Sequence, residues 1–377
     1  MNLLRFFNFI YKNSFFLFPI FLLINCSDFN KSSKIDLTEI LDSFPRLSPK
    51  DFVLPKSSSN KKCPLICYYN NTLKVMFYTS NNMKGKFNCK SKEELITFYP
   101  HNLDSIFLVY NDSIITVNNK GVVLNSVHYE NKFKYNQHNY SIGKLMYDYP
   151  NCSYINDKNV LLIQSNYYDN NWWSKDFFIN SMIITGINVN NGKLTMFNNI
   201  KYPNQYFTNC YAEHLNYYFT INDKSEIIFS FEAIPSLFSF KINSTENNLK
   251  IIDFSGLNEV PTFDTSYSND MNMIMEYHKN VNKFLKVIYD PYKDLYYRFY
   301  YLPTINFKQK EHGSFQSNFD TYLTVYNNNF KEIFKRNFGD SINPFGTFLS
   351  NKGLHIKSYK QSDKYEYYKI LSFNNFY

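Results

Sequence analysis

Residues 106–127 read IFLVYNDSIITVNNKGVVLNSV, and this stretch decides the class of fold. Two short runs of β-branched and aromatic residues, at 106–110 and 113–117, flank an Asn-Asp pair. A second polar turn at 118–121, which contains Asn and Gly, leads into a third run at 122–127. Asn and Gly suit the positive φ angles of tight hairpin turns. The stretch therefore predicts three antiparallel strands in a meander.

The same pattern returns along the rest of the chain. Comparable strand-and-turn units lie at residues 65–78, 160–197, 217–254, 283–301 and 321–373. A propeller blade is a four-stranded antiparallel meander, and the number of units predicts an all-β fold, a β-propeller with six blades. Two stacked sandwiches or one large barrel would fit the same density of strands. No alternation of strands and helices indicates a doubly wound sheet.

The N-terminus has the features of an exported lipoprotein. The apolar run Phe15–Ile24 follows Arg5 and Lys12, and is about half the length of roughly 20 residues that a membrane-spanning helix needs. The segment Leu23–Cys26 resembles the lipobox of bacterial lipoproteins, in which the cysteine receives the lipid and the chain is cut before it. We therefore expect residues 1–25 to be a signal peptide and Cys26 to be lipidated, with an ordinary signal peptide cut elsewhere as the alternative.

The domain organisation follows from this start. Residues 26–60 are expected to form the lipidated cysteine and a polar tether, and residues 61–377 the propeller domain. Within the tether, 27–34 is polar, 35–44 fits a short helix or an entering strand, and 45–60 is loop-like with three prolines. Anchoring through acyl chains would place the domain at the outer membrane of the cell envelope.

One hairpin links the chain to a known family. Residues 287–303 read VIYDPYKDLYYRFYYLP, with Asp290 and Pro291 in the turn and an aromatic returning strand. This segment resembles the DP turn and YYRF strand of an uncharacterised lipoprotein family of Bacteroidota, domain of unknown function 4221. The resemblance implies a six-bladed β-propeller and brings no catalytic residues with it. It leaves open whether the domain faces the periplasm or the cell surface.

Composition argues against several classes of function. The formal net charge is +8, and two of those charges would leave with the signal peptide. Lysines are scattered singly, so the basic patch expected of a nucleic-acid-binding protein is missing. The chain has seven histidines in no metal-binding motif and ten glycines, too few for a phosphate-cradling loop. We therefore expect no metal, no cofactor and no nucleic-acid partner.

Cysteines do not define a disulfide framework. Beside Cys26 there are five, an odd number, at positions 63, 67, 89, 152 and 210. In an exported protein Cys63 or Cys67 could pair with Cys89, and buried free thiols are the alternative. The sequence does not decide between these arrangements.

The best candidate for ligand binding is the segment 166–176, NYYDNNWWSKD. It contains the only two tryptophans, Trp172 and Trp173, beside Tyr167, Tyr168 and Asp169. Flat aromatic faces stack on sugar rings and neighbouring polar groups bond hydroxyls, so a glycan or an envelope protein is the expected partner. The alternative is that the two tryptophan side chains pack within the fold and do not contact a ligand.

Arg298 is a second candidate, placed among tyrosines in the hairpin strand. It could recognise an anion in the central channel, or stack and pair within the fold. Glu276 and His278 would share one face of a strand, and Glu213 adjoins His214, but two residues do not make a site.

The sequence therefore predicts a membrane-anchored propeller that acts as a binding or assembly module with no assigned catalytic residue. The alternative is a propeller enzyme acting on glycans, a hydrolase or lyase, which would need paired carboxylates or a Tyr/His acid–base set converging on a pocket.

Overall fold

The computed structural model describes the chain from residue 36 to residue 374 with gaps. The described residues are 36–45, 50–53, 63–69, 72–79, 82–84, 88–90, 95–102, 105–118, 122–143, 152–167, 174–197, 199–212, 214–242, 250–252, 257–303, 319–350, 353–361 and 365–374. Cys26 and the signal peptide predicted at 1–25 lie outside them.

The described strands form six antiparallel sheets. The first sheet contains β2 (Lys50–Val53), β3 (Cys63–Tyr69), β4 (Thr72–Thr79), β5 (Asn82–Lys84) and β6 (Asn88–Lys90). The second contains β7 (Leu95–Asn102), β8 (Ser105–Tyr110), β9 (Ser113–Val117) and β10 (Val123–His128). The third contains β11 (Lys132–Tyr135), β12 (His138–Ile142), β13 (Cys152–Ile155), β14 (Val160–Tyr167), β15 (Ile184–Asn188) and β16 (Leu194–Met196). The meander predicted at 106–127 is confirmed by β8, β9 and β10.

The other three sheets complete the molecule. The fourth contains β17 (Tyr217–Ile221), β18 (Glu226–Phe231), β19 (Leu237–Lys241) and β20 (Lys250–Ile252). The fifth contains β21 (Lys283–Asp290), β22 (Leu295–Pro303), β23 (Phe319–Asn327) and β24 (Glu332–Asn337). The sixth contains β25 (Ile342–Ser350), β26 (Gly353–Gln361), β27 (Tyr365–Asn374) and β1 (Asp36–Pro45). The last sheet joins the two ends of the described chain, because β1 pairs with β27 from Asp36 opposite Asn374 to Pro45 opposite Tyr365.

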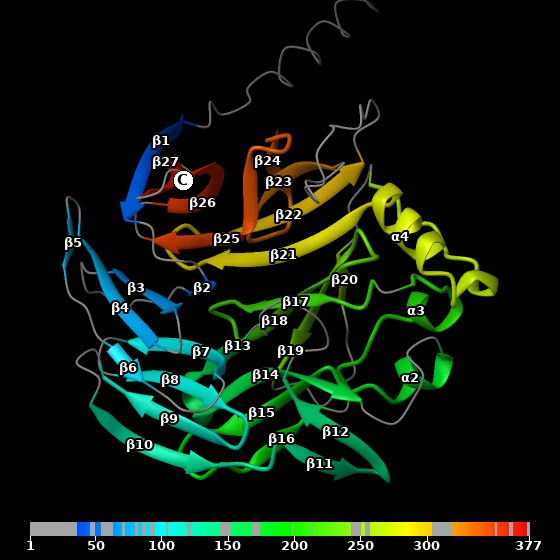
Figure 1. Ribbon diagram of the computed structural model, residues 1–377, viewed down its shortest axis with the longest axis horizontal. Helices are drawn as coiled ribbons and strands as arrows, with labels where there is room; N and C mark the ends of the chain where they lie inside the picture. The colour runs from blue at the N-terminus through cyan, green and yellow to red at the C-terminus, as the bar shows by residue number, and fades with distance from the viewer. Residues whose placement is uncertain are drawn as a thin grey trace, which may run out of the picture.

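One strand of each sheet contacts a strand of the sheet on either side. β7 contacts β2 and β13, β17 contacts β13 and β21, and β25 contacts β21 and β2. Figure 1 shows the sheets following one another around the molecule in chain order. The chain is therefore a mainly-β propeller, as the sequence predicts.

Strands also form where the sequence assigns the polar tether. β1 and β2 lie within residues 26–60, and β1 settles the choice between helix and strand left open for 35–44. The three prolines between 45 and 60 hide this signal, because proline argues against a strand. Strands of the propeller thus precede residue 61.

The aromatic hairpin packs on both faces. Leu295, Tyr297 and Phe299 of β22 lie in one apolar cluster with Leu354 and Leu371 of the last sheet. On the opposite face, Tyr296 packs with Ile228 and Leu237 of the preceding sheet. Successive side chains of β22 thus alternate between two neighbouring sheets.

The helices lie in the connections between strands. They are η1 (Asn156–Lys158), α2 (Lys175–Asn180), α3 (Gln205–Thr208), η2 (Thr265–Tyr267) and α4 (Met271–Asn280), and Figure 1 shows α2, α3 and α4 along one side of the molecule. None of the helices in the described part of the chain is long and apolar enough to cross a membrane.

α4 corrects one expectation from the sequence. Glu276 and His278 lie in a helix and not in a strand. Residues two apart in a helix are about 200° apart around its axis, so the two side chains do not share a face. The helix begins after Asp270, whose Oδ1 accepts hydrogen bonds from the amides of Asn272 at 2.9 Å and Met273 at 3.3 Å.

Candidate functional site

Three connections meet beside the sheet of β17–β20. They are the segment 199–216, which contains α3, the turn 232–236 between β18 and β19, and the segment 257–282, which contains α4. Tyr206 of α3 donates from its hydroxyl to the carbonyl oxygen of His214 at 3.0 Å. The amide of Val260 donates to the carbonyl oxygen of Ala233 at 3.2 Å, and the amide of Phe263 to that of Cys210 at 2.7 Å. Main-chain bonds therefore hold the three connections together.

A carboxylate and two imidazoles form a chain at this junction. Oε1 of Glu232 lies 3.5 Å from Nδ1 of His214, whose side chain has an exposed fraction of 0%. On the other side of the ring, Nε2 of His214 lies 2.9 Å from Nδ1 of His278 on α4. Nδ2 of Asn216 donates to Oε2 of Glu232 at 2.8 Å. These contacts thus run from the buried Glu232 to the half-buried His278 on an otherwise exposed helix.

Burial and neighbouring charges set the protonation of this cluster. Burial raises the pKa of Glu232, but His214, Lys283 and Asn216 favour the carboxylate more strongly and bring the pKa to about 2. Burial, together with His214 and Lys283, lowers the pKa of His278 to about 3. At neutral pH, Glu232 is therefore a carboxylate and His278 a neutral imidazole.

Arg298 fixes the turn that contains Glu232. Its side chain is 0% exposed on β22. It donates from Nη2 to the carbonyl oxygen of Ile234 at 3.1 Å, from Nη1 to that of Pro235, and from Nε to Oγ of Ser230 at 3.3 Å. Its guanidinium carbon lies 4.9 Å from the ring centre of Phe284. Burial lowers the pKa of Arg298 to about 10, while the phenols of Tyr326 and Tyr300 oppose that shift.

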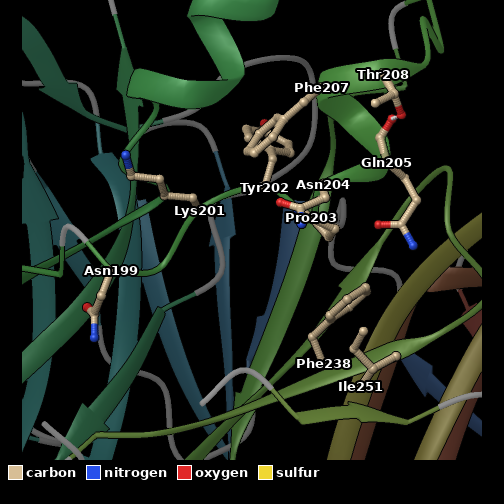
Figure 2. Close-up of a pocket in the computed structure, with 10 residues that line it drawn as sticks. All are labelled: Asn199, Lys201, Tyr202, Pro203, Asn204, Gln205, Phe207, Thr208, Phe238 and Ile251. Atoms are coloured by element: carbon tan, nitrogen blue, oxygen red, sulfur yellow. Dashed lines mark hydrogen bonds between the residues drawn. The ribbon is translucent and has the colours of Figure 1, made fainter. Parts of the chain in front are cut away.

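A pocket of about 920 Å³ lies beside the same junction. Figure 2 shows its ten lining residues: Asn199, Lys201, Tyr202, Pro203, Asn204, Gln205, Phe207, Thr208, Phe238 and Ile251. Eight of them come from the single segment 199–208, and the other two from β19 and β20. The size is within the usual range for small-molecule sites.

Buried tyrosines fix the pocket wall. Tyr202 donates from its hydroxyl to the carbonyl oxygen of Leu215 at 2.8 Å, and Tyr206 binds the carbonyl oxygen of His214. Their rings pack on each other with centres 5.0 Å apart and against Phe178 and Phe231. Buried ring contacts and hydrogen bonds therefore hold this side of the pocket in place.

Two further carboxylates approach each other at the opposite ends of these strands. The hydroxyl of Tyr289 lies 3.1 Å from Oδ2 of Asp223 and 3.0 Å from Oδ1 of Asp294. Asp223 lies in the β17–β18 turn and Asp294 in the β21–β22 turn. Because β17, β18 and β19 are antiparallel, the β17–β18 turn lies at the opposite end of the strands from the β18–β19 turn. Neither acid lines the pocket.

Of the ligand-binding candidates from the sequence, the structure describes Tyr167 and Arg298, which lie in different sheets. Tyr167 is buried at the end of β14, and its hydroxyl lies 2.8 Å from Nδ1 of His138. Arg298 is buried between sheets, as described above. Tyr168, Asp169, Trp172 and Trp173 lie outside the described residues.

In the described part of the chain, neither the cysteines nor the potential metal ligands form a further candidate site. Cys152 and Cys210 are free thiols there, and burial raises the pKa of Cys152 to about 12. The pairing of Cys63, Cys67 and Cys89 stays a prediction. Among the described residues, no group of three His, Cys, Asp or Glu side chains is placed to hold a metal ion.

Reasoning from the sequence missed the pocket and the His214–His278 contact. The two histidines are 64 residues apart, and only the fold brings their rings within 2.9 Å. The pocket segment 199–208 has one usable signal, a cluster of Asn, Gln and aromatic residues in a connection between strands.

Comparisons with known proteins concern the fold. The family model described as Domain of unknown function (DUF4221) matches residues 54–333. The crystal structure of a DUF4221 member from Bacteroides vulgatus has a TM-score of 0.70 and 14% identity, covering 92% of this chain and 100% of that one. No curated protein matches the sequence.

More distant likenesses are weak. A protein of unknown function from Bacteroides caccae has a TM-score of 0.38 and 10% identity, covering 75% of this chain and 80% of that one. The virginiamycin B lyase of Staphylococcus aureus has a TM-score of 0.43 and 7% identity, covering 88% of this chain and 99% of that one.

Proposed function

The chain belongs to the DUF4221 family, which is defined by a domain of unknown function, and from this premise we propose that it is a lipid-anchored β-propeller that works as a binding or assembly module of the cell envelope. The ligand occupies the pocket formed by residues 199–208, β19 and β20. Catalysis plays no part in this function.

One observation supports binding over catalysis. The ten residues that line the pocket include no aspartate, glutamate or histidine. The alternative, a glycan hydrolase or lyase, needs an acid–base pair in contact with the substrate. The Glu232–His214–His278 chain is committed to the junction between connections, and Asp223 and Asp294 both engage Tyr289.

Anchoring is the second part of the proposal. Cys26 carries the lipid, and residues 27–35 join it to β1, which begins at Asp36. Several acyl chains on one cysteine bury enough methylene groups, at about 0.8 kcal/mol each, to hold a protein at a bilayer. The domain sits at the outer membrane, on the periplasmic face or the cell surface.

The propeller has six blades in this proposal, one for each sheet. Six described sheets, each in contact with the sheet on either side, support this number. The pairing of β1 with β27 supplies the fourth strand of the last blade. In this proposal Tyr168, Asp169, Trp172 and Trp173 also contact the ligand. Tyr167 is buried at the end of β14 and Arg298 holds the β18–β19 turn, so both act by support and not by contact.

Site-directed photo-crosslinking in living cells of the source bacterium tests the binding function. A photoreactive residue replaces Gln205 in the pocket or, as the matched control, the exposed Asn272 on α4. We expect a reproducible adduct from position 205 and none from position 272. Adducts of equal yield from both positions, or from neither, would contradict the proposal.

Fractionation of the same cells tests anchoring. We expect the Cys26→Ala variant to leave the membrane fraction, because it has no thiol for the lipid. A control change of Cys152, which is a thiol within the fold, should not affect fractionation. Retention of Cys26→Ala in the membrane fraction would show that another feature anchors the protein.

A further inference from the structure

The pocket offers unused amide groups. Asn199 and Asn204 are exposed and Gln205 is half-buried, and within the described part of the chain their side-chain amides have no hydrogen-bond partner. Asn204 precedes α3, yet its side chain does not cap the helix. An amide can donate two hydrogen bonds and accept two. Three such groups on one short segment can thus satisfy several hydroxyl groups of a ligand.

The one charged side chain among the ten lining residues is held to one side of the pocket. Nζ of Lys201 donates to the carbonyl oxygen of Ile179 on α2 at 2.5 Å. Figure 2 shows this ammonium group directed away from Phe238 and Ile251. Burying a charged ligand without a counter-charge is costly. The site therefore favours an uncharged ligand.

Apolar faces complete the site. Phe207 is half-buried at the wall, Phe238 is buried at 1% exposure, and Ile251 is 52% exposed at the rim. Aromatic faces pack on the C–H faces of sugar rings, while amides bond the hydroxyls around the ring edge. An extended peptide would instead add to a strand edge. β20, the strand at the rim, spans only the three residues Lys250–Ile252.

We propose that this pocket binds a neutral oligosaccharide, with Asn199, Asn204 and Gln205 bonding its hydroxyl groups and Phe207 packing on a ring. This ligand class rests on the proposed binding function. The volume of about 920 Å³ accommodates more than one sugar ring.

Trp172 and Trp173 are the only tryptophans of the chain and lie, in the sequence, between β14 and Ser174, the N-cap of α2. In α2 the carbonyl oxygen of Ile179 accepts a hydrogen bond from Nζ of Lys201, a residue of the pocket lining. Tryptophan fluorescence is therefore measured beside calorimetry.

Titration of the full-length protein in detergent tests the ligand class. The neutral probes are the hexasaccharides of the cello, malto, manno and chito series, and the acidic probe is a hyaluronan hexasaccharide. Calorimetry gives the affinity, tryptophan fluorescence gives a second readout, and mass spectrometry of the recovered probe reports any chemical change. The variants are Asn204→Ala, Gln205→Ala and, as an exposed amide outside the pocket, Asn272→Ala.

We expect at least one neutral hexasaccharide to bind more tightly than the hyaluronan hexasaccharide. Asn204→Ala and Gln205→Ala should each weaken binding about 3- to 10-fold, the worth of one or two hydrogen bonds, while Asn272→Ala has no effect. Tighter binding of the acidic probe, no binding of any neutral probe, or insensitivity to both pocket variants would overturn the ligand class.

The same data separate this inference from the proposed function. If no saccharide binds but position 205 still gives a specific photo-adduct, the ligand class fails and the binding function stands. If a neutral saccharide binds and is recovered cleaved, the ligand class stands and the non-catalytic function fails.

Discussion

Arg298 is a buried cation whose hydrogen-bond acceptors are carbonyl and hydroxyl oxygens. Its Nε, Nη1 and Nη2 donate to Ser230, Pro235 and Ile234 in the β18–β19 region. Removing the guanidinium leaves these acceptors buried without their donor, which costs far more than the bonds contribute net. The residue therefore positions the turn that contains Glu232.

Substitution of Arg298 should accordingly affect stability. We expect Arg298→Met, which keeps the length of the side chain, to lower the free energy of unfolding by about 2–4 kcal/mol. Arg336→Met at a half-exposed site is the matched control and should cost under about 1 kcal/mol. Chemical denaturation measures both. Unchanged stability with altered ligand binding would instead make Arg298 a ligand-binding residue.

His278 gives the fold a dependence on pH. Its pKa is about 6.5 in an unfolded chain and about 3 in the fold. Between these values the unfolded chain binds more protons, so the stabilisation is complete above pH 6.5 and is lost as the pH falls toward 3. Glu232, with a pKa of about 2 instead of 4.5, adds a loss of stability as the pH falls below 4.5. The groups near His278 are His214, Glu232 and Lys283.

The unfolding temperature should therefore decrease as the pH is lowered from 6.5 to 4.5. The slope is at most about 1.4 kcal/mol per pH unit, and less because part of the imidazole is solvent-exposed. His278→Asn keeps a donor toward His214 and should reduce the dependence of the unfolding temperature on pH in this range. His128→Asn at an exposed site should leave that dependence unchanged. Calorimetry at a series of pH values measures the slope. An identical slope in His278→Asn and the unchanged protein would exclude His278 as the source.

At the level of elements, local patterns predicted strands well and helices poorly. β8, β9 and the β21–β22 hairpin follow from alternation and turn residues, which are local properties. α4 has a capping signal in Asp270, but only Ile274 of its ten residues is buried, so packing against the core contributes little to it. β1 and β2 pair with strands outside their own segment, so the local pattern left helix and strand open for β1 and gave no strand for β2.

The β15–β16 turn depends on one glycine. Gly192 has φ +73°, and a Cβ there would collide with the carbonyl oxygen of His128 in the neighbouring sheet. We expect Gly192→Ala to lower the free energy of unfolding by about 2–4 kcal/mol. Gly339, with φ +59° and nothing within 4 Å of its Cβ position, is the control. Gly339→Ala should cost about 1 kcal/mol. Equal costs in denaturant unfolding would show that backbone conformation alone, and not the contact with His128, matters.

At the level of the whole molecule, the ring is closed by its N-terminal strand. β1 pairs with β27 over ten residues, and β27 in turn pairs with β26. The sequence predicted the propeller class from the number of meanders. It did not predict this closure, because the two partners lie at opposite ends of the chain.

Closure can be tested by replacing residues 36–45 with a Gly/Ser segment of equal length. The loss of one full strand pairing should lower stability by at least about 3 kcal/mol, and the unfolding temperature by on the order of 10 °C. The same replacement of residues 27–35 should leave the unfolding temperature unchanged. If both replacements behave alike, β1 does not contribute to the ring.

Hydrogen–deuterium exchange of the full-length protein, with and without a cell-envelope extract of the source bacterium, tests the central claim most directly. Binding at the pocket predicts slower exchange in peptides that cover residues 199–208 and α2, with no change at the exposed α4. Exchange that is unchanged at 199–208, or slowed only around Asp223 and Asp294, would contradict a binding site at this pocket.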